Sequence, residues 1–215
     1  MKPDTVSGTL LILSSLIIVV VMAFHPTGHG LMNRETFAQT VHLGQVVHAL
    51  AIAATPLMFL GLLGVSRTSQ PSELAIAAMV ACGFGSVAVI SAALASGFVF
   101  PAVITRMVVE EEGTVPRAFL IYTSIWNRAF AGVHVVAFSV GIILLAIAIF
   151  GKRDRFRSGS GLGLVGIVVG VAVLVVFLSG KVHLDVHGAR ILWFLQSAWL
   201  LWLGVAMLIR RRLQI

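Results

Sequence analysis

Six long apolar stretches are the feature of this sequence that most restricts its fold. Each has about 20 residues or more, the length that an α-helix needs to cross the roughly 30 Å hydrocarbon core of a bilayer. Inside lipid every backbone polar group must be satisfied within the protein, and runs of this length satisfy them as helices. The sequence therefore predicts an all-α, polytopic integral membrane helical bundle in a single transmembrane domain, residues 1–215. The six predicted spans are about 8–25, 37–65, 73–104, 118–150, 161–180 and 189–209.

The composition agrees with a membrane protein and leaves no separate soluble domain. Hydrophobic residues make up 59% of the chain and charged residues 11%, whereas a soluble domain has about 25% charged residues. The net charge of +7 does not point to nucleic acid, because no basic stripe interleaved with aromatic residues is present. In a membrane protein Lys and Arg instead collect in cytoplasmic loops.

The basic residues predict the orientation of the bundle. They fall on alternate connections, so that one side of the membrane receives Lys2, Arg67, the cluster at 152–157 and Arg210 to Arg212. This side is predicted to be cytoplasmic, with both ends of the chain inside and three sequential helical hairpins between them. The other three connections, 25–36, 105–117 and 180–188, face outward, which in a bacterial inner membrane is the periplasmic side.

Histidines gather at the predicted outer boundary. Four of the seven lie within residues 24–48, which join the first two spans. The outer edge of the hydrocarbon core can be placed by counting about 20 residues back from the cytoplasmic ends of the even-numbered spans. This count puts His134 of the fourth span and His187 beside the sixth span near the same edge as His48. The sequence thus predicts one layer of five histidines, contributed by several helices: His25, His48, His134, His183 and His187.

Imidazoles in such a layer favour a haem or metal site, because they cost less to bury than Lys or Asp and are common ligands of haem iron, zinc and copper. A haem held between helices needs two facing imidazoles. His48 and His134 are the predicted pair, and His25 or His187 could replace either one. Arg128 and Lys181 are placed a turn or two outward to pair with propionates. For a transition metal ion, all five histidines of the layer are candidate ligands, and the His183-x-x-x-His187 spacing puts two rings on one helix face.

No catalytic residue is predicted. The chain has no phosphate loop, no nucleotide-binding fingerprint, no H-E-x-x-H zinc motif and only one cysteine, Cys82. No span has an acidic residue at mid-depth, which disfavours a carboxylate-driven carrier. The stretch 118–150 is longer than one bilayer crossing, so it either projects from the membrane or breaks near Asn127 and Arg128.

These observations predict a membrane redox or metal-binding protein that holds a b-type haem or a Cu, Zn or Fe ion near the outer leaflet. It would serve as an electron-transfer or oxidoreductase component with a membrane or periplasmic redox partner, and a homo-oligomer is compatible with this function. Two alternatives stay open. One is a small transporter or channel-like protein with an outer-face histidine metal or proton site. The other is a structural or assembly subunit whose histidines are ordinary interfacial residues.

Overall fold

The structure is a computed structural model, and it describes residues 3–26, 34–68, 73–106, 117–150, 159–182, 184 and 186–212. These residues form helices and short turns, and no strand occurs among them. The helices are α1 (Pro3–Ala23), α2 (Arg34–Thr68), α3 (Glu73–Leu94), the π-helical turn η2 (Ala95–Val99), α4 (Phe100–Thr105), α5 (Arg117–Phe150), α6 (Gly159–Leu178) and α7 (Val186–Arg212).

The predicted all-α chain with six spans is confirmed at the level of the helices. Six helical segments are long and apolar enough to cross a membrane: Asp4–Ala23, Ala38–Arg67, Glu73–Thr105, Ala118–Phe150, Gly161–Leu178 and Val186–Ile209. The third segment is one rod made of α3, η2 and α4. Of the two alternatives for the stretch 118–150, a break near Asn127 and Arg128 is not found, because α5 is a continuous helix of 34 residues.

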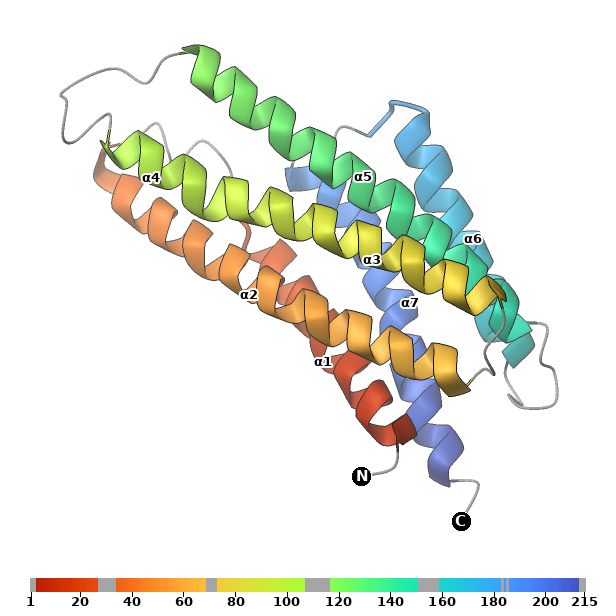
Figure 1. The fold of residues 1–215 in the computed structure, drawn as a ribbon. Coiled ribbons are helices and arrows are strands. Elements are labelled where there is room, and N and C mark those ends of the chain that lie inside the picture. Colours follow the sequence, from red (N-terminus) through yellow and green to blue (C-terminus); the bar gives the residue numbers. More distant parts are fainter. Residues whose placement is uncertain are drawn as a thin grey trace.

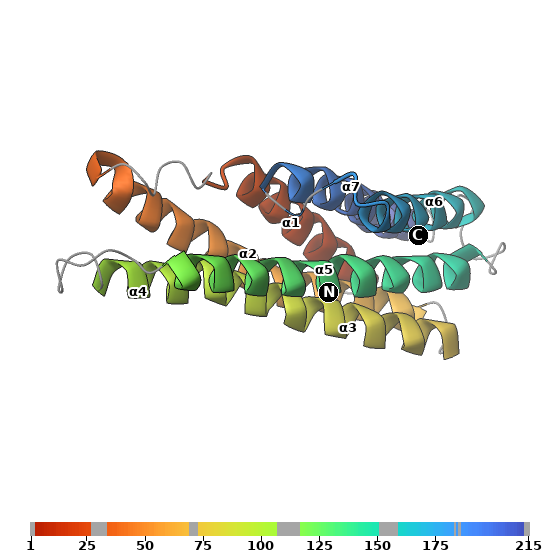
Figure 2. The ribbon, with the colours of Figure 1, turned by 90° about the horizontal axis from the view of Figure 1, so that it is seen from above.

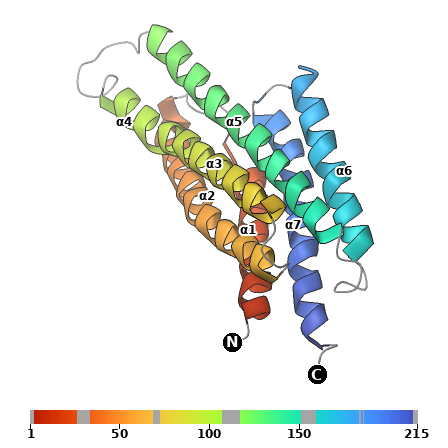
Figure 3. The ribbon, with the colours of Figure 1, turned by 45° about the vertical axis from the view of Figure 1, so that its right-hand side comes forward.

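The helices differ in length, and α7 with its 27 residues lies between the longest and the shortest. At about 1.5 Å per residue, α2 and α5 are about 50 Å long, whereas α1 and α6 are about 30 Å long. Figure 1 shows the long rods α2, α3–α4 and α5 running beside one another, inclined to α1, α6 and α7. Figure 3 shows the same division from another side, and Figure 2 shows α3–α4 and α5 side by side from above. Helices longer than the hydrocarbon core commonly tilt in this way.

The six rods form a closed ring in which most neighbours in space are neighbours in sequence. α1 packs against α2 and α7, α3 against α2 and α5, and α6 against α5 and more lightly against α7. Small residues bring the rods together, as membrane helices require. A Cβ atom at Gly61 of α2 would overlap Leu11 of α1, and one at Gly204 of α7 would lie 2.9 Å from the Gly8 carbonyl oxygen of α1.

Apolar side chains fill the inside of the ring and also cover its outside. Leu62, Phe138 and Leu203 are buried to 99% or more in the main core. On the outer face of α3, Phe84 and Val87 are exposed by 68% and 65%. A water-soluble monomer rarely leaves such continuous apolar faces open, so this surface agrees with lipid as the surrounding medium.

Candidate histidine sites

Two histidine rings meet where α1 ends and approaches α2. His25 follows the last turn of α1, and His48 lies in α2 with only 8% of its surface exposed. Their ring centroids are 4.9 Å apart with an interplanar angle of 70°. A Cβ at Gly44 would lie 3.8 Å from the Pro26 Cγ, an ordinary contact, so this approach does not depend on the glycine.

Hydrogen bonds determine which nitrogen of each ring carries the proton. Nδ1 of His48 lies 2.6 Å from the Gly44 carbonyl oxygen, and Nδ1 of His25 lies 3.0 Å from the Pro26 carbonyl oxygen. A carbonyl oxygen only accepts, so in the neutral rings Nδ1 is the donor and Nε2 has the lone pair. Neither Nε2 atom has a hydrogen-bond partner in the described part of the chain. This commitment of one nitrogen to a backbone carbonyl is typical of metal-ligating histidines.

A widened helical turn receives the side chain of His48. Gly97 belongs to η2, and a Cβ at Gly97 would overlap the Cβ and Cγ atoms of His48. The buried Pro101 follows one turn later, at the start of α4. π-turns inside α-helices are uncommon and often occur at functional sites. Here the π-turn and its glycine let the backbone of the third rod approach α2 directly at His48.

Arg190 holds the end of α1 in place from α7. Its Nε donates to the Met22 carbonyl oxygen at 2.6 Å, and its NH2 group donates to the carbonyl oxygens of Ala23 and His25 at 3.3 and 3.2 Å. The last carbonyls of a helix have no partner within it, and a cation there also matches the helix dipole. Arg190 therefore fixes the chain at His25 as well as joining α1 to α7.

The surroundings of His25 favour its neutral form. Burial, the neighbouring His48 and the Arg190 charge lower the pKa of His25 to about 4, against a smaller opposite effect of its bond to the Pro26 carbonyl. Near neutral pH the ring therefore keeps its Nε2 lone pair available. A ligand for a metal ion must be deprotonated in this way.

His134 forms a separate site within the ring of helices. It is 5% exposed, and its Nδ1 lies 2.9 Å from the Gly85 carbonyl oxygen of α3. The ring stacks on Phe138 at a centroid distance of 5.2 Å and meets Trp193 of α7 edge-on at 5.4 Å. The same reasoning as for His48 gives Nδ1 the proton and Nε2 the lone pair, and no hydrogen bond of Nε2 occurs among the described residues.

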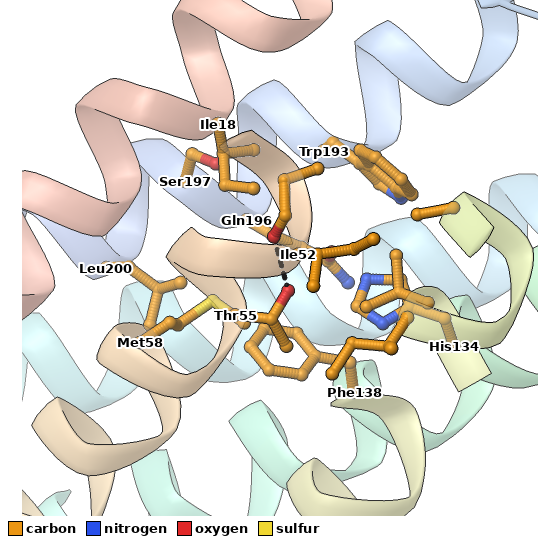
Figure 4. A pocket seen from close by; sticks show the side chains of 14 residues that line it. Ile18, Ile52, Thr55, Met58, His134, Phe138, Trp193, Gln196, Ser197 and Leu200 are labelled. Atoms are coloured by element: carbon orange, nitrogen blue, oxygen red, sulfur yellow. Dashed lines mark hydrogen bonds between the residues drawn. The ribbon is translucent and has the colours of Figure 1, made fainter. Parts of the chain in front are cut away.

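His134 lines a cavity of about 30 Å³, which we call the central cavity. Figure 4 shows Thr55 from α2, His134 from α5 and Gln196 from α7 around this space. The Thr55 hydroxyl donates to the Ala51 carbonyl oxygen at 2.8 Å. The Gln196 amide nitrogen donates to the Ser139 hydroxyl at 3.0 Å and so links α7 to α5. Most of the remaining wall is apolar.

The structure does not bring His48 and His134 to face each other. Both contact the third rod, but His134 bonds to Gly85 whereas His48 lies against Gly97. These two positions are about 18 Å apart along the rod, at 1.5 Å per residue. Two axial nitrogens of one haem would be only about 4 Å apart, twice a metal–imidazole bond of about 2 Å. The predicted single layer is thus divided into the His25–His48 pair and the separate His134.

The other predicted site residues lie elsewhere. Arg128, Lys181 and His187 are exposed on the surface. His183 lies outside the described residues. Within the described ranges, no group of three or more His, Cys, Asp or Glu side chains is placed to hold a metal ion.

Arg190 and Gly97 were not among the site residues predicted from the sequence. Arg190 was visible in the sequence as the only basic residue within the first turns of the last span, although its target on α1 was not.

Comparison of the chain with protein-family models, with curated proteins and with solved structures finds no match. The function must therefore be argued from the chemistry of these residues.

Proposed function

We propose that this chain is a membrane metal-binding protein of the redox or metal-handling class, with His25 and His48 as the ligand pair at the predicted outer face. The observation that supports this proposal is the pairing itself. Two imidazoles from different helices lie 4.9 Å apart at their centroids. Each gives its Nδ1 to a backbone carbonyl, which leaves two Nε2 lone pairs with no hydrogen-bond partner in the described chain.

The separation of the rings fits one shared ion better than a haem. With metal–nitrogen bonds of about 2.0–2.1 Å, two imidazoles on one tetrahedral ion have centroids about 5 Å apart. Axial ligands on opposite sides of a haem would have centroids about 6 Å apart at similar bond lengths. Imidazole nitrogen suits Zn, Cu, Fe and Ni. Water would complete the coordination, as it does at open metal sites.

A transport function is the second candidate, and the central cavity favours it. Ala51 and Ile52 line this cavity and follow His48 by three and four residues, which places them on the same face of α2. The cavity therefore begins about one helical turn inward from the pair. In a transporter, the His25–His48 pair would be the outer metal or proton site, and the cavity would be the next binding site along the path.

Metal titration of the purified protein tests the proposal. Zn²⁺ binding measured by calorimetry, with elemental analysis of the protein as isolated, is expected to show one site that His25→Ala or His48→Ala weakens by well over 10-fold. His42→Ala is the matched control, because His42 is exposed one and a half turns away on the same helix. Equal Zn²⁺ affinity in wild type and His48→Ala, with intact folding, would refute the proposal.

Two further measurements separate the other functions. A Soret band in the visible spectrum of the purified protein would show a haem and would return the redox interpretation to its b-type form. Zn²⁺ flux into liposomes that His48→Ala abolishes would favour the transporter. Protein without metal that co-purifies with stoichiometric membrane partners would favour the assembly subunit.

A further inference from the structure

Two side chains that line the central cavity each have a polar atom with no hydrogen-bond partner among the described residues. Nε1 of Trp193 is a buried donor without an acceptor, and Nε2 of His134 is the lone-pair nitrogen left by the bond from Nδ1 to Gly85, as judged over the described residues. Both side chains line the cavity, and their rings are in contact at a centroid distance of 5.4 Å. One of the two atoms donates and the other accepts, so they are complementary to a molecule that does both.

We infer that the central cavity is a hydrated binding site, which takes a water-sized neutral molecule that donates to Nε2 of His134 and accepts from Nε1 of Trp193. This inference does not rest on the proposed metal site. It makes the centre of the bundle a place where a small polar molecule is held, about one helical turn inward from His48 along α2.

The size of the cavity sets the class of ligand. The cavity of about 30 Å³ has room for about two waters, because one water needs roughly 10–15 Å³. An organic substrate is too large for this space. Water itself is the first expected ligand, and other neutral molecules of its size with both a donor and a lone pair belong to the same class.

The polarity of the wall distinguishes this cavity from a dry packing defect. Apolar cavities stay empty, whereas a buried water needs two to four polar partners. Besides His134 and Trp193, the polar residues that border the space are Thr55, Gln196 and Ser197. The Thr55 proton is used in the bond to the Ala51 carbonyl, so its oxygen remains an acceptor. The buried Trp193 donor destabilises the fold if it stays unpaired, and a water that accepts from it removes this cost.

Solid-state NMR of the protein in lipid bilayers tests the site directly. Histidine and tryptophan are labelled with ¹⁵N, and the His134 and Trp193 signals are assigned with His134→Gln and Trp193→Phe. We expect His134 to be protonated on Nδ1 and both His134 Nε2 and Trp193 Nε1 to receive magnetisation from water protons. An Nε2 or Nε1 signal that receives none would overturn the inference.

A cavity-filling variant shows whether that water sits in the cavity. Ala93 lines it, and Ala93→Val adds two methyl groups to the space. We expect the water signal at both nitrogens to be lost while the Nδ1 proton of His134 remains. Ala51 lines the cavity from α2, and Ala51→Val serves as the second variant if the first does not fold. Water contact that persists in a folded filling variant would place the water outside the cavity and refute the proposal.

Discussion

Gly97 offers the sharpest test of how the His25–His48 pair is built. A Cβ at Gly97 would overlap Cβ and Cγ of His48, so Gly97→Ala adds an atom where none fits. The neighbour cannot avoid the new methyl group by rotating, because the His48 Cβ is fixed to the backbone of α2. Carbon atoms in contact lie about 3.5–4.0 Å apart, so α2 and η2 must separate by about 1 Å.

The cost can be worked out with a second glycine as reference. In a helix interior, Gly→Ala gains up to about 1 kcal/mol of intrinsic propensity, whereas forcing an extra carbon into a packed site costs about 1–3 kcal/mol. At Gly83, in the same rod, a Cβ would meet only the Phe59 ring at 3.6 and 3.9 Å, which are ordinary contacts. Gly83→Ala should therefore be neutral or stabilising. The difference between the two variants isolates the overpacking and should be about 1–3 kcal/mol.

Unfolding in mixed micelles by SDS titration measures that difference, and Zn²⁺ calorimetry on the folded variants measures its effect on the pair. We expect Gly97→Ala to be the less stable variant and to bind Zn²⁺ about 10-fold or more weakly than Gly83→Ala, because His48 moves with α2. If both variants are equally stable, the close approach of η2 to His48 is not a feature of the folded protein. If Gly97→Ala is destabilised but binds Zn²⁺ like wild type, the proposed metal site at His48 is wrong although the packing is right.

Three further predictions follow from single contacts. Arg190→Gln should lower the free energy of unfolding by about 2–4 kcal/mol, since the hydrogen bonds of a cation to the end of α1 are lost, and Arg190→Lys should recover only part of it in the same SDS titration. Because the pKa of His25 is lowered to about 4 from 6.5, the unfolded chain binds more protons between these values. Stability should therefore be full above pH 6.5 and fall by up to about 3 kcal/mol towards pH 4, and His25→Ala should flatten this part of the pH profile. Trp199→Phe should cost about 1–3 kcal/mol, because the Leu162 carbonyl loses its Nε1 donor at 3.0 Å and the ring loses volume against α6, whereas the exposed Trp202→Phe should cost little.

The six spans were predictable because their cause is local. In lipid, a run of about 20 apolar residues pairs all its backbone groups within itself only as a helix. The observed ends differ from the predicted ones by only a few residues, as in α5, which begins at Arg117 where 118 was expected. The burial of His48 and His134 was foreseeable for the same reason, since each interrupts an otherwise apolar helix.

The separation of His48 from His134 was not predictable, because it depends on how the helices are inclined. The expected common level came from counting residues back from one side of the membrane, which is valid only for upright helices of one length. The bundle instead combines rods of about 50 Å with rods of about 30 Å at different inclinations. The π-turn at 95–99 also has no sequence signature, since a glycine within a span serves many purposes.

The Nδ1 hydrogen bonds of the histidines are not equally strong evidence for a function. In His48 the bond from Nδ1 to Gly44 is a contact within one turn of α2, and a histidine with no function beyond filling its helix would make it too. In His134 the bond reaches Gly85 on another helix, so it fixes the ring against α3 and decides where Nε2 lies. His25 has little helix of its own to hold it, yet Arg190 fixes its backbone from α7. A chain that needed its histidines only as interfacial residues would gain nothing by holding His25 against His48 with the partly buried cation of Arg190 nearby, because that arrangement disfavours the charged ring. The arrangement is useful if the neutral His25 ring, with its Nε2 lone pair, is the form that binds a ligand.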